Sequence, residues 1–287
     1  MANLRDIRRR IGSVKNTQQI TKAMKMVAAA KLRKAQANMI AARPFASKML
    51  DVLNSLATRA DQDAHPLLAK REEKNIRVVV VTADRGLCGA FNTNILRFAR
   101  REVENLAAKS ERVVVDCVGR KGWDHFKRRD FELGEHWSGL FRKVRYQDAE
   151  KIAGGYIDAF SKGETDAVYL VYNRFKSVIA QEVVVERLLP IQRLKTNKPE
   201  ALLDYIYEPT EKALFGSLLP KHVAFQVFHS MLESGAAEQA ARMTAMESAT
   251  SNASEMIDSL TLYANRVRQA TITKELIEVV SGAQALG

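Results

Sequence analysis

The sequence has 287 residues, of which 46% are apolar and 27% charged, a composition typical of a folded globular protein. It contains no apolar run long enough for a membrane-spanning helix, and its N-terminus shows no apolar signal core. Its two cysteines, Cys88 and Cys117, fall in no CxxC pattern, which indicates a reducing compartment.

The net charge of +12 is concentrated in the first fifty residues, where twelve basic residues against Asp6 alone give +11. Such asymmetry indicates that the N-terminal segment faces something acidic. Nucleic acid, anionic lipid and an acidic protein surface all satisfy this requirement, and composition does not choose among them.

Residues 4–35 are predicted to form a long helix, because strong helix formers dominate and apolar or small residues recur at alternating steps of three and four. This repeat is typical of a coiled-coil seam. We expect Pro44 to bend or end the helix near Arg43. The seam positions are Leu4, Ile7, Ile11, Val14, Gln18, Thr21, Ala28, Leu32 and Ala35.

The middle of the chain has the pattern of a small α/β domain of Rossmann-like type. Short β-branched runs alternate with helix-like stretches, which predicts a small parallel sheet with helices on its faces. A further candidate strand, 180–189, ends at Pro190 and is expected at an edge. The other expected strands are 76–82, 113–118 and 167–172, and the expected helices are 91–107 and 148–162.

A second long helix is predicted from about 210 to 285, with a kink near Pro220 or Gly235. Its seven-residue repeat requires another helix as partner. The N-terminal helix is the expected partner, in either direction, with antiparallel favoured. The fold class is therefore α/β plus a long coiled coil, divided as 1–60, 70–194 and 208–287. The second seam is Met246, Ala249, Ala253, Met256, Leu260, Tyr263, Val267 and Ala270.

No catalytic, cofactor or metal site is expected. Loop 84–89 lies where nucleotide-binding folds hold phosphate, but it matches neither GxxxxGK[ST] nor GxGxxG, so a tight turn is the expected role. The five histidines fall in no ligand spacing, and Cys88 is interpreted as a small buried hydrophobe rather than a reactive thiol.

Three blocks of sequence resemble the gamma subunits of bacterial F-type ATP synthases. They are residues 7–31, residues 84–89, and the C-terminal stretches 238–250, 265–270 and 272–276. Their order and spacing follow that family along nearly the whole chain. One departure concerns Tyr263, which precedes Ala264-Asn265-Arg266 and so stands one place earlier than in the family's Tyr-Asn-Arg.

The resemblance implies a central rotor stalk. The terminal helices would form an antiparallel coiled coil inside a hexameric head of alternating alpha and beta subunits, and the α/β domain would meet epsilon and the membrane c-ring. ATP would be made or hydrolysed on beta, so this chain would be a non-catalytic subunit without a cofactor. It would lie peripherally at the cytoplasmic face of the bacterial inner membrane, with no direct membrane insertion.

The resemblance also assigns roles to particular residues. Shaft packing between the two helices would use Met24, Arg242 and Met246, and an apolar bearing would be formed by Val279, Val280, Ala283 and Leu286. Contacts with the beta subunit would be made by Arg8, Arg9, Arg10, Lys15, Arg85, Arg268, Gln269 and Thr273.

Two other functions fit parts of the sequence. The basic segment could bind nucleic acid phosphates, although it has no aromatic residue before Phe45 for base stacking, and no nucleic-acid partner is expected. The loop after the first strand could belong to a nucleotide-dependent enzyme, but the phosphate-binding lysine is missing.

Overall fold

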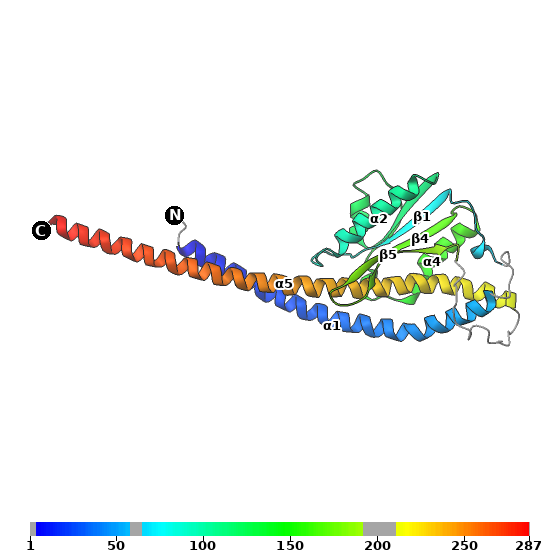
Figure 1. The fold of residues 1–287 in the computed structure, drawn as a ribbon, viewed down its shortest axis with the longest axis horizontal. Helices are drawn as coiled ribbons and strands as arrows, with labels where there is room; N and C mark the ends of the chain where they lie inside the picture. The colour runs from blue at the N-terminus through cyan, green and yellow to red at the C-terminus, as the bar shows by residue number, and fades with distance from the viewer. Residues whose placement is uncertain (1–3, 58–64, 192–210, 287) are drawn as a thin grey trace. The chain divides into compact units, whose positions relative to one another are not determined.

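The computed structural model describes residues 4–57, 65–191 and 211–286, without the side chains of 43, 46–47, 50–57, 211–215 and 285–286. The chain forms two compact units, one of Met1–Ala28 with Arg242–Gly287 and one of Ala29–Ala241. Two long helices, α1 (Leu4–Ala57) and α5 (Glu211–Leu286), contribute to both units (Figure 1). Among the described residues, no helix is long and apolar enough to cross a membrane.

The larger unit is built on one five-stranded sheet in the order β3-β2-β1-β4-β5. Four strands run parallel, and β5 pairs antiparallel with β4 at one edge. The expected strand at 180–189 is therefore an edge strand. The strands are β1 (Asn75–Val81), β2 (Arg112–Val118), β3 (Glu132–Trp137), β4 (Ala167–Phe175) and β5 (Gln181–Leu189).

Both faces of this sheet are buried, which explains the unbroken apolar run in β1. Val78 and Val80 belong to a core with Ile95 and Ala99 of α2 (Phe91–Ala107). The alternate residues of β1 point to a second core, which includes residues of α4 (Tyr146–Ser161) and α5. Shorter helices, η1 (Pro66–Leu68), α3 (Arg120–Phe126) and η2 (Leu140–Arg142), complete the unit.

The predicted α/β fold with long terminal helices is confirmed, and strand β3 is an element that was not predicted. Pro44 lies inside α1, which continues to Ala57, so of the two predicted effects only a bend remains as a prediction. Helix α5 is assigned as one helix from Glu211 to Leu286, and the kink near Pro220 or Gly235 stays a prediction. The predicted boundaries 1–60, 70–194 and 208–287 follow element type, whereas the two compact units divide both long helices, and those boundaries stay a prediction.

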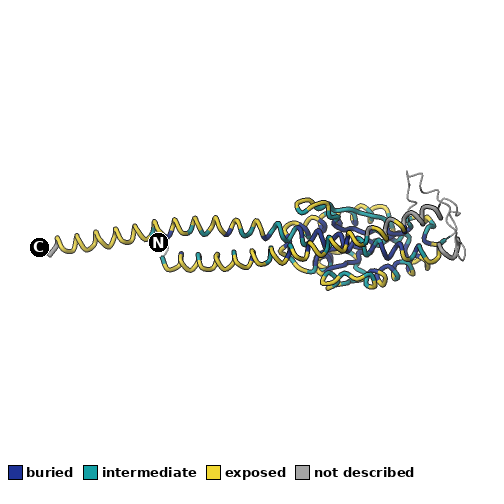
Figure 2. Tube along the Cα trace, turned by 90° about the horizontal axis from the view of Figure 1, so that it is seen from below, coloured by how far each residue is buried: buried dark blue, intermediate teal, exposed yellow. Residues whose placement is uncertain are grey.

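The smaller unit is a two-stranded coiled coil whose helices run antiparallel. Thr21 Oγ1 and Thr250 Oγ1 are 2.7 Å apart, and Lys25 Nζ donates to Glu247 Oε1 at 2.6 Å. A residue further along α1 thus meets one further back on α5. Between the helices lie buried Ile7, Thr21, Ala28, Met246, Ala253 and Ala264 (Figure 2).

The seam on α1 is as predicted, but on α5 two predicted positions give way to the next residue and the last, Ala270, is exposed. Ile257 is half-buried and Ala264 buried, whereas the predicted Met256 and Tyr263 are 52% and 43% exposed. From Met246, the residues that face α1 follow at steps of four and then three, at positions 250, 253, 257, 260, 264 and 267, whereas steps of three and then four were predicted. Tyr263 therefore lies outside the helix–helix contact, and the small side chain of Ala264 fills the place beside it.

The register also shows where pairing ends. Counting outward from Thr21 and Thr250 places Leu4, the first described residue of α1, near Val267, and both are half-buried. Every described side chain of α5 beyond Val267, from 268 to 284, is exposed. The last part of α5 is thus a single helix without a packing partner in the described part of the chain.

Candidate functional site

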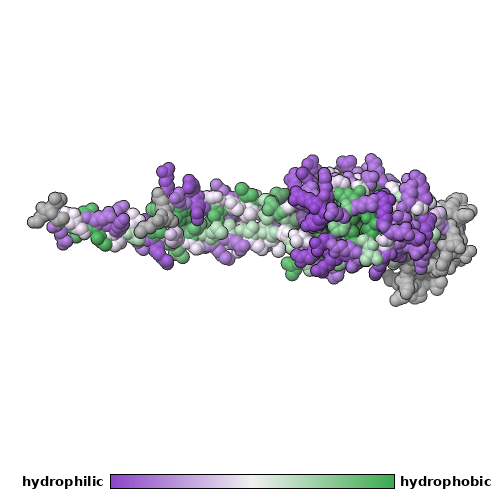
Figure 3. Space-filling view, turned by 90° about the horizontal axis from the view of Figure 1, so that it is seen from above, coloured by the Kyte–Doolittle hydropathy of each residue, from purple (hydrophilic) through white to green (hydrophobic). Residues whose placement is uncertain are grey.

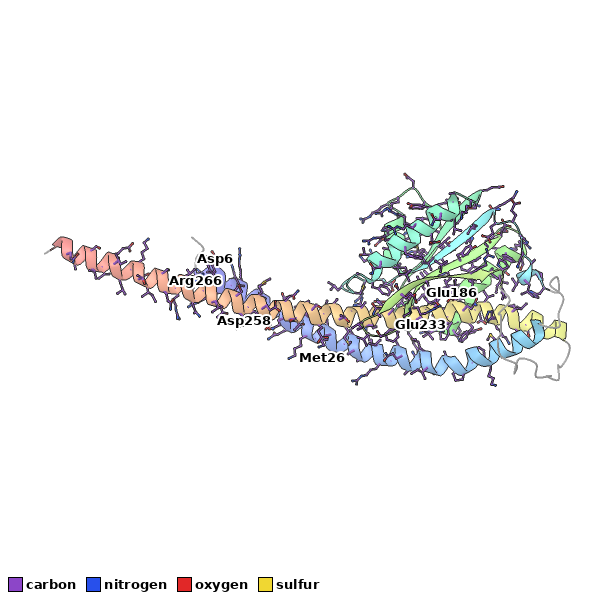
Figure 4. All side chains as sticks on the ribbon, viewed as in Figure 1. Asp6, Met26, Glu186, Glu233, Asp258 and Arg266 are labelled. Carbon is purple, nitrogen blue, oxygen red and sulfur yellow. The ribbon has the colours of Figure 1, made fainter. Side chains whose placement is uncertain are left out.

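The basic residues assigned to contacts on α1 form an exposed surface. Arg8, Arg9, Arg10 and Lys15 are all exposed, and Arg9 Nη2 lies 2.9 Å from Asp6 Oδ1 one turn earlier (Figure 4). Both members of that pair are largely solvent-accessible, so the pair contributes little to stability. With one acidic residue in this stretch, the surface presents a net positive charge to any partner.

The contact residues assigned to α5 lie on its single-helix part. Arg268, Gln269 and Thr273 are exposed, and the Thr273 hydroxyl donates to the carbonyl oxygen of Gln269 at 2.9 Å. Because this bond leaves the hydroxyl's lone pairs available, Thr273 can still accept a hydrogen bond from a partner. All the assigned contact residues except Arg85 belong to the coiled-coil unit.

Arg85 belongs to the α/β unit, in a loop held by side-chain hydrogen bonds. Asp84 accepts from the backbone N–H groups of Arg120 at 3.1 Å and Gly139 at 3.0 Å. Asn92 accepts from Ala83 N at 3.1 Å and donates to the carbonyl oxygen of Arg85 at 3.4 Å. The loop is thereby fixed on both sides while the Arg85 side chain remains exposed.

The crevice beside this loop is closed by the chain itself. In open α/β sheets, ligands bind outside the carboxyl ends of the parallel strands, where neighbouring connections diverge. Here Ala83, Cys88 and Phe91 pack in that region against Ala237 of α5, with Phe175 and Ala241 alongside. The residues that follow β1 therefore form a packed contact with a helix, in keeping with the predicted tight turn.

The shaft-packing residues lie at the end of the coiled-coil unit where its α1 segment ends, at Ala28, and its α5 segment begins, at Arg242. Met246 is buried, and Met24 and Arg242 are half-buried. Small residues such as Ala28 accompany them, which lets the helix backbones approach closely.

The residues assigned to the apolar bearing lie on the single-helix part of α5. Val279, Val280 and Ala283 are exposed, and the side chain of Leu286 lies outside the described side chains. Ile272, Leu276 and Ile277 extend the same apolar surface, and the sequence analysis did not assign them to it. The steps of four and five residues from Ile272 to Leu276 and Ile277 could have indicated this surface from the sequence. Figure 3 shows apolar atoms along this segment.

Metal-ligating side chains and thiols are potentially reactive groups of the described residues. No group of three or more metal-ligating side chains occurs among them. Cys88 and Cys117 are buried, and desolvation together with the neighbouring Asp116 charge raises the pKa of Cys117 to about 12. A thiol with that pKa is protonated near neutral pH and is a poor nucleophile.

Comparison with known proteins identifies the family. A family model described as ATP synthase matches residues 3–286. The ATP synthase gamma chain of Anaeromyxobacter sp. (strain Fw109-5) is 52% identical over the full length of both chains. The chain belongs to the ATP synthase gamma family. The gamma chain of Geobacter sp. (strain M21) is 48% identical, with 100% of this chain and 99% of that one covered.

Solved structures agree with this assignment of the gamma-family chain. A chain in the central stalk and c-ring structure of the Tetrahymena thermophila mitochondrial ATP synthase is 28% identical, with a TM-score of 0.60 over 80% of this chain and 99% of that one. A chain in the Euglena gracilis mitochondrial ATP synthase rotor is 20% identical, with a TM-score of 0.66 over 94% and 98%, and it shows a shared fold. The family match includes both the basic helix and loop 84–89.

Proposed function

We propose that this gamma-family chain is the central rotor stalk of an F-type ATP synthase. It would couple ion flow through the membrane c-ring to ATP synthesis or hydrolysis on a head of alpha and beta subunits. The chain would take no direct part in the chemistry, which would occur on beta. It would lie peripherally at the cytoplasmic face of the bacterial inner membrane, with epsilon as a further partner.

The observation that carries this proposal is the single-helix part of α5. Residues 268–284 are exposed and include the large apolar side chains Ile272, Leu276, Ile277, Val279 and Val280. An apolar surface of this kind is unfavourable in water and usually marks a contact with another protein. A collar formed by the subunits of the head would cover it on all sides, as a bearing must.

Charge supports the same partner. The exposed arginines of α1 present cations on the paired part of the coiled coil, and Arg85 presents another from the α/β unit. Each exposed pair with a partner carboxylate contributes only ~0.2–1 kcal/mol, so the effect depends on the cluster as a whole. Acidic segments on beta would meet these cations as the stalk turns.

Coupling follows from the asymmetry of the stalk. The cluster Arg8, Arg9 and Arg10 lies on α1, whereas α5 extends alone beyond Val267, so the faces presented to successive catalytic sites differ. A partner that contacts one face more favourably than another shifts the conformational equilibrium of the site that faces it. Rotation would therefore change the nucleotide affinity of each site in turn.

Reconstitution tests the proposal. The purified chain is mixed with separate alpha and beta subunits, and the subunit ratio and MgATP hydrolysis of the product are measured. We expect hydrolysis in a complex holding one copy of this chain per three beta subunits. Failure to join such a complex, together with tight, salt-sensitive binding to DNA, would make the basic helix a nucleic-acid surface and refute the rotor proposal.

A charge-reversal variant sharpens the test. Changing Arg8, Arg9 and Arg10 to glutamate should weaken assembly or coupling by an amount equivalent to about 1–3 kcal/mol. The same charge change on α2, at Arg97, Arg100 and Arg101, provides the matched control, because these side chains are also exposed. Equal effects of the two triple variants would indicate that net charge alone, rather than the α1 surface, is responsible.

A further inference from the structure

One face of the α/β unit carries a concentration of basic side chains. Helices α2 and α3 pack on the core of that face of the sheet, whereas α4 and α5 pack on the core of the other face (Figure 1). Residues 91–107 and 120–130, which comprise α2, α3 and the turn after α3, hold eight basic against four acidic residues, a net charge of +4. All eight basic side chains are exposed and together form the basic face: Arg97, Arg100, Arg101, Arg120, Lys121, Lys127, Arg128 and Arg129.

The positive charge of the basic face is local and largely unpaired. Outside the first fifty residues the chain carries +1 in total, so the remainder beyond the two basic-face segments carries −3. Glu104 lies 3.5 Å from Arg100, and Asp124 lies 3.7 Å from Arg120. Within the described part of the chain, the other six basic side chains form no ion pair with an acidic residue. An excess of cations therefore remains available to a partner.

His125 shows that the cations of two elements come close together. Burial lowers the pKa of its imidazole, and the charges of Arg129, which follows α3, and of Arg100, on α2, lower that pKa further. Arg129 Nη1 also donates to the carbonyl oxygen of His125 at 2.8 Å. Helix α2 and the turn after α3 therefore contribute to one cationic surface.

The side chains of the basic face favour a membrane surface as its partner. No large apolar side chain is exposed in residues 91–107 or 120–130, whereas the centre of a protein–protein interface is apolar and depleted in charge. The same segments expose no aromatic ring on which nucleic acid bases could stack. A bilayer with acidic phospholipids requires neither feature, because it presents negative charge over a wide area. Each Lys or Arg held near such a surface strengthens binding about fivefold.

We propose that the basic face lies on an anionic phospholipid surface, where it holds the α/β unit by charge and no side chain enters the hydrocarbon. The inference rests on the proposed function only for the location of the chain beside a membrane. Because the attraction is electrostatic, it extends over about one Debye length and weakens as salt is added. The contact should depend on the charge of the lipid headgroups and not on their identity.

Contact with vesicles is measured with a fluorescent dye at one introduced cysteine. Cys88 and Cys117 are buried, so the dye attaches selectively to an exposed cysteine. Asn105→Cys places the dye on α2, one turn beyond Arg101, and Ser161→Cys places it at the end of α4, which packs on the other core. The vesicles contain phosphatidylcholine and phosphatidylglycerol in a three-to-one ratio, with a quencher attached to some of the headgroups.

The basic cluster of α1 would compete for the same lipid, so every labelled chain carries Arg8→Gln, Arg9→Gln and Arg10→Gln. At about 0.1 M salt, the vesicles should quench the dye at position 105 and not the dye at position 161. At about 1 M salt, where the Debye length is about 3 Å, the quenching should disappear. Vesicles of phosphatidylcholine alone should quench neither dye.

Two triple variants test whether the basic face itself makes the contact. The first removes three of its cations: Lys121→Gln, Lys127→Gln and Arg128→Gln. The matched control removes three exposed cations around η2, where neighbouring side chains pack on the other core: Arg142→Gln, Lys143→Gln and Arg145→Gln. The lipid concentration for half-maximal quenching should rise about ten- to hundredfold in the first variant and under about threefold in the control. Urea unfolding followed by tryptophan fluorescence verifies that both variants are folded.

Several results would overturn the proposal. Equal losses in the two triple variants would mean that net charge alone attracts the chain to lipid. Quenching at position 161 and not at 105, or quenching by phosphatidylcholine alone, would assign the contact to another surface or another force. If vesicles leave the dye at position 105 unquenched while duplex DNA binds the chain and the first triple variant releases it, the face binds nucleic acid instead.

Failure of the proposed function would look different. The vesicle assay contains no alpha or beta subunits, and reconstitution with those subunits contains no lipid. A chain that joins alpha and beta but leaves the dye at position 105 unquenched keeps the rotor proposal and loses the lipid surface. A chain that contacts vesicles through position 105 but joins no complex keeps the lipid surface and loses the rotor proposal.

Discussion

Replacing Asp116 with alanine removes the acceptor at the centre of a buried network that joins four elements of the α/β unit. Its side chain is fully buried and accepts from Glu135 N at 2.5 Å, Tyr156 Oη at 3.0 Å and Arg77 Nη1 at 3.3 Å. The change would leave a buried hydroxyl, a backbone N–H and a partly buried guanidinium without their acceptor. Breaking a buried ion pair by removing one partner costs about 3–5 kcal/mol, and we expect a loss of stability in that range.

The tryptophans make this loss measurable in one unit. The chain has two, Trp123 and Trp137, and both belong to the α/β unit, so their fluorescence reports unfolding of that unit and not of the coiled coil. Trp137 also packs against Tyr156, with ring centroids 6.1 Å apart. With a urea m-value of about 2 kcal/mol/M, the alanine variant should unfold at a urea concentration lower by about 2 M.

Two further variants define the result. Burial raises the pKa of Asp116, against the opposing effects of the Glu135 N–H and the Arg77 charge, so the neutral isostere Asp116→Asn should cost less, about 1–3 kcal/mol. Asp124→Ala removes a half-buried carboxylate that pairs with Arg120 one turn away and should cost under about 0.5 kcal/mol. If Asp116→Ala shifts the midpoint no more than Asp124→Ala, the network does not hold these elements together.

Three more outcomes are expected from packing and titration. Gly134→Ala places a Cβ 2.2 Å from the Asp116 Oδ1 atom and should lower stability by about 1–3 kcal/mol. Gly154→Ala, in a helix with open space around the new Cβ, should raise stability. Urea unfolding detected by tryptophan fluorescence distinguishes the two variants. Burial lowers the pKa of His222 to about 4, so the unfolded chain binds a proton at a higher pH than the folded chain does. Stability should therefore decline by about 3 kcal/mol as the pH falls from 6.5 to 4. In the His222→Gln variant, the urea midpoint should not show this part of the pH dependence. Ile7→Ala removes a buried side chain and should destabilise the coiled coil by about 2–4 kcal/mol, whereas Ile20→Ala, at an exposed position, should not. Amide hydrogen exchange in the paired segments measures the difference. Equal exchange rates in the two variants would contradict the observed seam.

Local periodicity predicted most of the fold, and its failures have physical causes. Strand β3 reads Glu132-Leu133-Gly134-Glu135-His136-Trp137, which lacks the apolar run that marked the other strands. Its place in the sheet depends on contacts far away in sequence, chiefly the bond from Glu135 N to Asp116 and the absence of a side chain at Gly134. A pattern within one segment contains no information about either contact.

The shifted seam on α5 has a similar origin. Both Met256 and Ile257 are apolar, as are Tyr263 and Ala264, so the sequence alone allowed either neighbour to face α1. The choice follows from the partner, because Thr21 and Thr250 share a hydrogen bond that sets the register. Thr250, which was not among the predicted seam positions, therefore lies opposite Thr21 of the predicted α1 seam.

For the candidate site, the sequence was enough to predict that the assigned charged residues are exposed, but not the geometry of loop 84–89. Basic side chains on a long helix are exposed by default, and the resemblance supplied their roles. Neither the positive φ of Leu87 nor the packing of loop 84–89 against Ala237 has a signature in local sequence, because each is set by tertiary contacts. The contact roles of the assigned residues remain proposals that assembly experiments can test.

The contact of α5 with the carboxyl ends of the strands has a mechanical consequence. Glu233 of α5, labelled in Figure 4, accepts from Phe175 N at 2.7 Å. Ala237, one turn further along α5, packs against the loop after β1. A hydrogen bond from the sheet backbone to the Glu233 carboxylate and close packing of small side chains thereby join the helix to the sheet, and both oppose sliding of one along the other. A twisting load applied to the sheet would pass directly into this segment of α5, as through a keyed joint rather than a hinge.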